Sequence, residues 1–355
     1  MGYEYPIDAK AMFEDRFGEF VGLGVPKAEV AEMQTAITDM WSNAPGGWVY
    51  EWSRLAQRHA DANEMFLASL AYGCAKFPCL ANDARRTALP KQVETYLAAA
   101  PGFPVKFERR LIDLPYKGST TTVPAHFYSA TGQYGHQPIL LFNGGVDTWK
   151  MDSHGIFIAL AQHLPVTVMA FDQPGTGETD VPLSAAADEV VLGLVAEARR
   201  IGNGKLAHFG MSFGANYSAM TGLLKVVDAS IILGGPVDHA FAPEALQKLP
   251  YGMQDIIAND MGFDRQPSEA EFMAAADKLA RRDLLARPDN APLLVINGAD
   301  DYFVPQADTL LFENRKDCEV HLIPGTGHCA FSKLPEVMSL IAHWLPTQLG
   351  LTRPQ

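Results

Sequence analysis

The chain has 355 residues, of which 48% are hydrophobic and 19% charged, as in an ordinary globular protein with a large core. Its net charge of −13 argues against nucleic acid and anionic membranes as partners. No signal peptide and no apolar run of membrane-spanning length is visible, and the spacing of the four cysteines fits neither a metal site nor a disulfide framework. We therefore expect a cytoplasmic protein of one large or two smaller domains.

The first 103 residues are predicted to form a helical N-terminal cap or lid region. Apolar residues recur there at helical spacing in three stretches: 28–41, 47–71 and 87–99. The region also holds Trp41, Trp48 and Trp52. We favour the interpretation that these rings pack the helices together, because large aromatic side chains mostly lie in cores. The alternative is that one or two of them line an aromatic substrate pocket.

Residues 104–355 have the pattern of a doubly wound α/β core. Strands are predicted at 105–114, 121–128, 138–142, 166–171, 206–209, 231–233, 292–296 and 319–323. Helices are predicted at 156–164, 190–201, 215–226 and 334–345. Buried strands that alternate with helices indicate a mostly parallel sheet covered on both faces. The segment of about 236–290 is an insertion with an apolar part and a capping box that starts at Ser268.

A Gly-x-Ser-x-Gly pattern joins a predicted strand to a predicted helix. It comprises Gly210, Ser212 and Gly214. A serine at such a sharp turn has a strained backbone that exposes its hydroxyl, and the flanking glycines allow the strand and helix to pass closely. The helix N-terminus adds a partial positive charge where an oxyanion would form. Ser212 is therefore the candidate nucleophile; the alternative is an ordinary turn with a capping serine.

A serine nucleophile needs a base and an acid, and both are expected in loops that follow later strands. His328 follows the 319–323 strand and is the candidate base. Asp300 and Asp301 both follow the 292–296 strand. The Gly-x-x-Asp-x-x-Val-Pro spacing favours Asp301, and the chain order Ser, Asp, His is typical of this architecture.

Two backbone N–H groups should form the oxyanion hole. One is that of Phe213, directly after the candidate nucleophile, and the other belongs to Gly145 or Val146 in the loop after the 138–142 strand. A second Gly-rich turn, at 171–177, lacks the full fingerprint of a phosphate or dinucleotide site, so it is interpreted as structural.

Ser212, Asp301 and His328, with the Gly144-Gly145 loop and the Asp172-Gln-Pro-Gly-x-Gly turn, resemble the α/β-hydrolase superfamily. A narrower resemblance covers nearly the whole chain. The stretch Gly-Gly-Val-Asp-Thr-Trp-Lys at 144–150, the Trp-x-x-x-Trp pair at 48–52 and Phe-Pro at 77–78 are similar to the esterase family named for the fermentation–respiration switch protein.

That family includes 2,6-dihydroxypseudooxynicotine hydrolase and fungal polyketide-shortening hydrolases. The resemblance implies that the N-terminal helices cover the active site and that a carbon–carbon bond next to a ketone is cleaved. It also implies an extra acidic residue at the site, for which Asp238 and Glu244 both qualify, and His239 is equally placed to face the pocket. Trp149 is a further candidate for substrate binding.

We expect a serine hydrolase that acts through an acyl-enzyme and cleaves such a bond in an aromatic or polyketide-like small molecule. A carboxylesterase or lactonase, and an acyltransferase or cyclase, remain alternatives because the same triad serves all of these reactions. A non-catalytic protein on this fold would predict a damaged triad, whereas all three residue types are present. The sequence indicates no cofactor or metal, and it leaves a homodimer open.

Overall fold

The computed structural model describes residues 2–351, which divide into two compact units. The helical unit comprises the chain up to Phe103 together with Met151–Gly155 and Pro250–Pro267. The sheet unit comprises Pro104–Lys150, Ile156–Leu249 and the chain from Ser268 onward. None of the helices in the described part of the chain has the length and apolar character needed to cross a bilayer.

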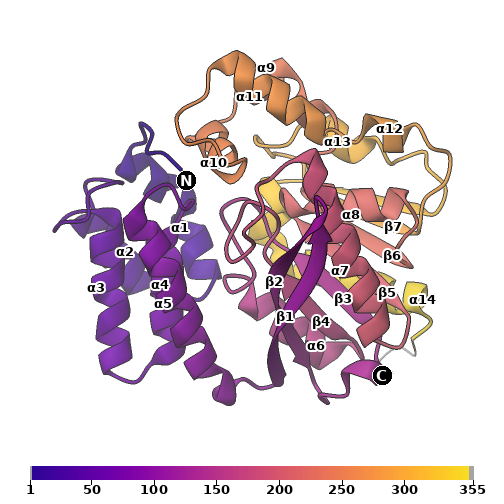
Figure 1. The fold of residues 1–355 in the computed structure, drawn as a ribbon, viewed down its shortest axis with the longest axis horizontal. Helices are drawn as coiled ribbons and strands as arrows, with labels where there is room; N and C mark the ends of the chain where they lie inside the picture. The colour runs from indigo at the N-terminus through magenta and orange to yellow at the C-terminus, as the bar shows by residue number, and fades with distance from the viewer. Residues whose placement is uncertain (1, 352–355) are drawn as a thin grey trace. The chain divides into compact units, whose positions relative to one another are not determined.

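The helical unit is built mainly from consecutive N-terminal helices, which Figure 1 shows in indigo to violet, and from one later helix, which is drawn in orange. These are α1 (Ala9–Gly22), α2 (Lys27–Ala36), α3 (Trp48–Asp61), α4 (Met65–Lys76) and α5 (Asp83–Ala99), followed by the 3-10 turn η1 (Ala100–Gly102) and, far along the chain, α10 (Met253–Asp260). The single helix predicted over 47–71 is two helices, because Asn63 adopts a left-handed conformation (φ 62°) that ends α3. The helix predicted over 28–41 ends at Ala36, because Ile37 is extended.

Aromatic rings fill the interior of the helical unit. Trp48 and Trp52 are fully buried and lie against Phe13 and Phe20, with ring centroids 4.8 to 6.4 Å apart. The Trp48 indole N–H also donates to the Cys74 carbonyl at 2.7 Å. These contacts confirm the interpretation that Trp48 and Trp52 pack the helices together.

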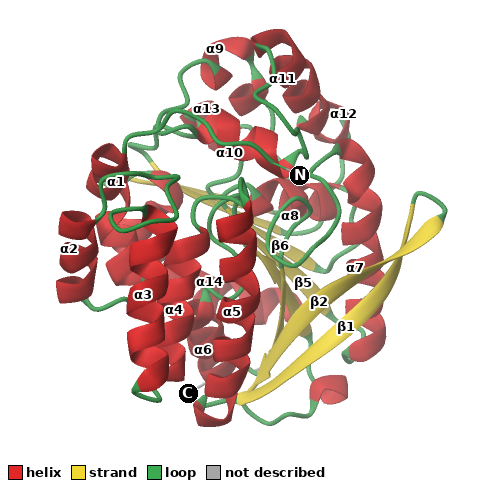
Figure 2. Cartoon of the chain, turned by 60° about the vertical axis from the view of Figure 1, so that its left-hand side comes forward, coloured by secondary structure: helices red, strands yellow, loops and turns green. Residues whose placement is uncertain are grey.

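The sheet unit is organised around one twisted sheet, drawn in yellow in Figure 2. Its strands are β1 (Lys106–Tyr116), β2 (Ser119–Ser129), β3 (Ile139–Asn143), β4 (Thr167–Phe171), β5 (Leu206–Met211), β6 (Ala229–Leu233), β7 (Leu293–Gly298) and β8 (Cys318–Ile323). Within residues 2–351 the strands form an eight-stranded sheet in the order β1-β2-β4-β3-β5-β6-β7-β8. β2 is antiparallel to both of its neighbours, β1 and β4, and β3 to β8 are parallel to one another. The predicted α/β class and mostly parallel doubly wound sheet are confirmed.

The helices of the sheet unit cover both faces of the sheet. The longer ones are α6 (His154–His163), α7 (Asp188–Ile201), α8 (Gly214–Leu223) and α14 (Leu334–Leu349). The chain moves from β3 to β4 in one direction across the sheet and from β4 through β5 to β6 in the other. Because such crossovers are right-handed, α6 lies on the face opposite α7 and α8.

Short elements complete the sheet unit. They are the turns η2 (Tyr134–His136), η3 (Ala185–Ala187), η4 (His239–Phe241), η5 (Asp277–Leu279) and η6 (His328–Lys333), and the helices α9 (Pro243–Leu246), α11 (Glu269–Ala276), α12 (Arg282–Leu285) and α13 (Gln306–Leu310). The predicted capping box is present: the Ser268 side chain accepts from the Glu271 N–H, and the Glu271 carboxylate accepts from the Ser268 N–H. Because β3 to β8 are parallel, the loops that follow them all lie at one edge of the sheet, where the candidate site is found.

Candidate active site

Ser212 lies at a tight turn between β5 and α8. Its φ of 56° is left-handed, a conformation that costs energy for any residue with a side chain. A Cβ on Gly210 would lie 2.3 Å from the Gly214 carbonyl oxygen, and one on Gly214 would lie 2.3 Å from the Gly144 oxygen. Both glycines are therefore required by close backbone approach, and the Ser212 N–H is fixed by a 2.8 Å hydrogen bond to the Leu233 carbonyl.

The structure brings the three residues predicted as a triad into one chain of hydrogen bonds. His328 Nε2 lies 2.8 Å from Ser212 Oγ, and His328 Nδ1 lies 2.7 Å from Asp301 Oδ2. An ionised carboxylate only accepts, so the Asp301 contact places the imidazole proton on Nδ1. That tautomer leaves Nε2 free to accept the hydroxyl proton of Ser212.

The two adjacent aspartates at the acid position have different contacts. Asp301 is the one that contacts His328, and its side chain is 1% exposed. The backbone N–H of Asp300 donates to the Thr326 carbonyl instead. The spacing argument and the observed geometry therefore select the same residue.

Local charges set the ionisation of the pair. Burial opposes the charged form of His328, but the neighbouring Cys329 and Asp301 outweigh it, and the pKa of His328 lies well above its usual value. Burial raises the pKa of Asp301, but His328 and hydrogen bonds from the Asn297 amide and the Phe303 N–H lower it by more, so the net pKa is below its usual value. The pair therefore favours an ionised Asp301 and a strongly basic His328.

Sequence reasoning missed Asn297, which joins the acid loop to the base loop. Its side-chain N–H donates to Asp301 Oδ2 at 2.8 Å, while its Oδ1 accepts from the Gly298 and Cys329 N–H groups. Asn297 is fully buried at the end of β7. Its position beside the Asp301 loop was visible in the sequence, but its contact with Cys329, 32 residues away, was not.

The candidate oxyanion residues lie beside Ser212. A Cβ on Gly145 would lie 2.9 Å from Ser212 Oγ and 3.8 Å from the Phe213 nitrogen, so the loop packs directly against the turn. The Gly145 N–H already donates to the Thr148 carbonyl at 3.0 Å. Of the two residues left open by the sequence, this contact favours Val146 as the second donor.

The candidate substrate-binding residues have other contacts. Asp238 accepts from Arg282 Nε at 2.6 Å, and the hydrogen bonds and ion pairs described for residues 2–351 link none of Asp238, His239 and Glu244 to the triad. Trp149 is 2% exposed, and its indole N–H donates to the Val146 carbonyl at 3.0 Å. A substrate contact for these four residues stays a prediction.

Asp308 holds the loop that carries Asp238 and His239. Its carboxylate accepts from the backbone N–H groups of Asp238, His239 and Ala240 at 2.6 to 2.9 Å. Burial raises the pKa of Asp308, although these three hydrogen bonds act in the opposite direction. Nothing in the local sequence of α13 indicated this role, because the bonded N–H groups lie about 70 residues earlier.

The chain matches a known family over most of its length. A family model described as "Esterase FrsA-like" matches residues 27–349. Esterase FrsA of Vibrio vulnificus strain YJ016 is 27% identical over 286 residues, which cover 74% of this chain and 67% of that protein.

Two solved structures have the same fold as this chain. "AbyA5 Wildtype" superposes with a TM-score of 0.79 at 20% identity and covers 96% of this chain and 95% of its own. The 2,6-dihydroxy-pseudo-oxynicotine hydrolase superposes with a TM-score of 0.72 at 20% identity and covers 96% of this chain and 98% of its own. Both alignments include the helical unit as well as the sheet unit, because they span nearly the entire chain.

Proposed function

The chain belongs to the FrsA-like esterase family and is a hydrolase with the α/β-hydrolase fold, and from this premise we propose that Ser212, His328 and Asp301 are its catalytic triad. The observation that carries the proposal is the unbroken chain of hydrogen bonds from Ser212 Oγ through His328 to Asp301. This arrangement supplies a nucleophile, a base of fixed tautomer and an acid that stabilises the imidazolium.

The reaction proceeds through an acyl-enzyme. Ser212 Oγ attacks the carbonyl carbon of the substrate as its proton moves to His328 Nε2, and the oxyanion that forms accepts from the Phe213 and Val146 N–H groups. The bond to the leaving group then breaks with its electron pair, and His328 returns the proton to that group. Water, deprotonated by His328, hydrolyses the ester on Ser212, releases the carboxylic acid and restores the serine.

We propose that the bond cleaved is a carbon–carbon bond next to a ketone in an aromatic or polyketide-like molecule. A carbon leaving group is tolerable only as an enolate or an electron-rich ring, so the substrate must delocalise the electron pair. The contact between Asp301 Oδ2 and His328 Nδ1, 2.7 Å long, supports this chemistry because the carboxylate stabilises the imidazolium that must persist until it protonates carbon. The likeness to 2,6-dihydroxy-pseudo-oxynicotine hydrolase agrees with it.

An esterase activity is the second candidate, and the observation in its favour is the similarity to Esterase FrsA. The leaving group of an ester is an alkoxide or a phenolate, which needs less stabilisation than a carbanion does. The same triad and the same oxyanion donors would serve both reactions.

The two activities are separated by matched substrates. Purified protein is incubated with 1,3-diketones and acylated resorcinols, and in parallel with aryl esters of the same acids, and the products are identified by mass spectrometry. Carbon–carbon cleavage predicts release of the acid and the shortened ketone or free ring. Turnover of the esters alone would reject the carbon–carbon proposal, and ester products made with an added alcohol would indicate an acyltransferase.

A fluorophosphonate probe tests the triad independently of the substrate. We expect labelling of the wild-type protein and none of Ser212→Ala. Labelling that survives in Ser212→Ala would reject Ser212 as the nucleophile.

A further inference from the structure

Lys150 ends the loop that carries the candidate oxyanion donors, and its side chain is completely buried. Burying a charged ammonium group is costly unless carboxylates pair with it and satisfy its hydrogen bonds. Lys150 is the last residue of the Gly-Gly-Val-Asp-Thr-Trp-Lys stretch, and it takes no part in the acyl-enzyme steps. Its burial at the end of this loop needs an explanation.

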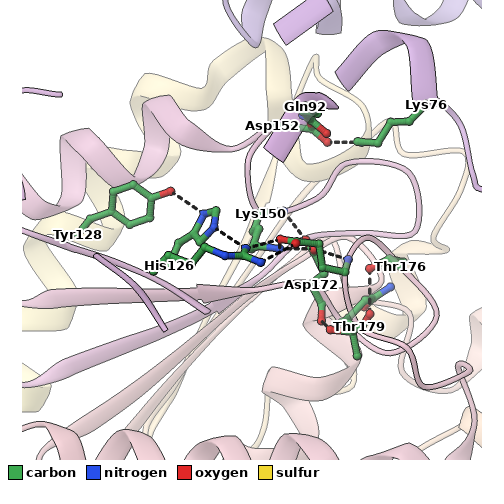
Figure 3. Close-up of polar contacts among 12 residues, drawn as sticks. Lys76, Gln92, His126, Tyr128, Lys150, Asp152, Asp172, Thr176 and Thr179 are labelled. Carbon is green, nitrogen blue, oxygen red and sulfur yellow. Dashed lines mark hydrogen bonds and ion pairs between the residues drawn. The ribbon is translucent and has the colours of Figure 1, made fainter. Parts of the chain in front are cut away.

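Two carboxylates hold Lys150 from the turn that follows β4. Asp172 accepts the Lys150 backbone N–H at 2.9 Å through Oδ1, and its Oδ2 pairs with Lys150 Nζ. Glu178 Oε2 accepts from Nζ at 2.8 Å. Figure 3 shows Lys150 and Asp172 pointing toward each other at the end of the strands. Asp172 thus binds both the main chain and the side chain of Lys150.

The turn is itself built around these carboxylates. The Glu178 N–H donates to Asp172 Oδ2 at 2.9 Å, and a Cβ on Gly177 would lie 2.0 Å from the same oxygen. Arg109 from β1 makes two hydrogen bonds to Glu178, at 2.7 and 2.8 Å. The two cations and two anions balance, so the network is neutral as a whole. The turn at 171–177, with Glu178, therefore binds the Lys150 side chain. The sequence predicted only that this turn is structural.

Hydrogen bonds inside the loop connect Lys150 to the residues that lie beside Ser212. The Gly145 N–H donates to the Thr148 carbonyl, and the Trp149 indole N–H donates to the Val146 carbonyl, so the loop is closed on itself. These two hydrogen bonds tie Gly145 and Val146 to the segment that ends at Lys150. The position of Lys150 therefore helps to set the position of the Val146 N–H relative to Ser212.

We propose that Lys150, held by Asp172 and Glu178, is a positioning residue that fixes the oxyanion loop against Ser212. This inference rests on the proposed serine-hydrolase function. Lys150 does not touch the reacting atoms; it acts through the peptide N–H of Val146. Loss of the anchor lets the loop relax, and the N–H donor then lies too far from the developing oxyanion to stabilise it.

The test compares Lys150→Met and Asp172→Asn with the wild type, and Glu178→Gln serves as the milder third variant. Active sites are counted by end-point fluorophosphonate labelling, so that rates refer to folded enzyme. We expect kcat to fall by roughly 10- to 1,000-fold, because complete loss of one oxyanion donor costs about 100- to 1,000-fold and a displaced donor costs less, while KM changes by less than about threefold. Affinity for a trifluoromethyl ketone, whose adduct with serine carries an oxyanion, should fall in parallel with kcat.

The matched control is Asp188→Asn, which removes the charge of one partner of a partly buried ion pair in the sheet unit. Asp188 accepts two hydrogen bonds from the 6%-exposed Arg281, at 2.6 and 2.8 Å. This variant should lose stability as the test variants do but keep kcat and ketone affinity at the wild-type level.

The outcomes distinguish the inference from the proposed function. If Ser212→Ala is inactive but the Lys150, Asp172 and Glu178 variants keep wild-type kcat and ketone affinity per labelled site, the positioning role is rejected while the triad stands. Should Lys150→Met fail to fold, Glu178→Gln decides, because it removes one charge without removing atoms. Activity that survives in Ser212→Ala would reject the proposed function itself.

Discussion

The interior of the helical unit and the carboxyl edge of the sheet are held together by opposite kinds of contact. Trp48 and Trp52 lie in an apolar core of aromatic rings. At the sheet edge, Asn297, Asp301 and His328 form a chain of short hydrogen bonds that ends on a strained serine. Apolar packing is non-directional and mainly adds stability, whereas a polar chain fixes directions. Substitutions in the first region should therefore change folding, and those in the second should change turnover.

Each region also contains a buried lysine, and Figure 3 shows both. Lys76 of the helical unit donates to Asp152 at 2.7 Å, and Gln92 donates to the same carboxylate. Lys150 of the sheet unit pairs with Asp172 and Glu178. The chemistry is nearly the same, so the difference lies in what each lysine holds: Lys150 anchors the loop that carries the candidate oxyanion donors.

The largest expected effect is that of Ser212→Ala. Without the hydroxyl no acyl-enzyme can form, so kcat should fall by roughly 10⁴- to 10⁶-fold. The melting temperature, followed by circular dichroism, should stay close to that of the wild type because the substitution removes one partly exposed oxygen. A loss of turnover smaller than tenfold would contradict the assignment of Ser212 as the nucleophile.

Asp301→Asn should lower kcat by roughly 10⁴-fold, because an amide can hold His328 in the wrong tautomer. Asp300→Asn is the matched control, since it makes the same carboxylate-to-amide change in the adjacent residue. Steady-state kinetics of both variants should give a large effect for Asp301 and nearly wild-type rates for Asp300. The reverse result would assign the acid to Asp300.

Trp48→Ala tests the role of the apolar core of the helical unit. Removing a fully buried indole should cost about 3–5 kcal/mol in the free energy of unfolding, measured in urea. The rate of fluorophosphonate labelling per folded molecule should change by less than about threefold, because a small probe reports on Ser212. Unchanged stability would contradict the assignment of Trp48 to the core.

The pH dependence of kcat/KM tests the role of His328 at the sheet edge. Only neutral His328 can accept the Ser212 proton, so kcat/KM should rise with pH through the pKa of His328. Because that pKa is raised, the midpoint of the acid limb should lie above the usual histidine value of about 6.5. In Asp301→Asn the residual activity should show a lower midpoint, since a carboxylate no longer stabilises the imidazolium. A wild-type midpoint below 6 would contradict the geometry.

The strands, and the meeting of Ser212, His328 and Asp301 at one edge of the sheet, could be predicted because their signals are local. Buried strands read as apolar runs, and the Gly-x-Ser-x-Gly motif needs only its own neighbours. The break at Asn63 was missed because the helices on both sides bury apolar residues in one core, so the periodicity continues across it. The roles of Asp308 and Lys150 were missed because each depends on residues more than 20 positions away.

The central claim is that Ser212 carries the acyl group during turnover. It is tested most directly by acid-quenching the enzyme during turnover of a slowly deacylating substrate and mapping the peptides by mass spectrometry. The peptide that contains Ser212 should gain the mass of the acyl group, and this mass should be absent in Ser212→Ala. An acyl group on a different residue, or product formation with no acylated peptide at any time, would contradict it.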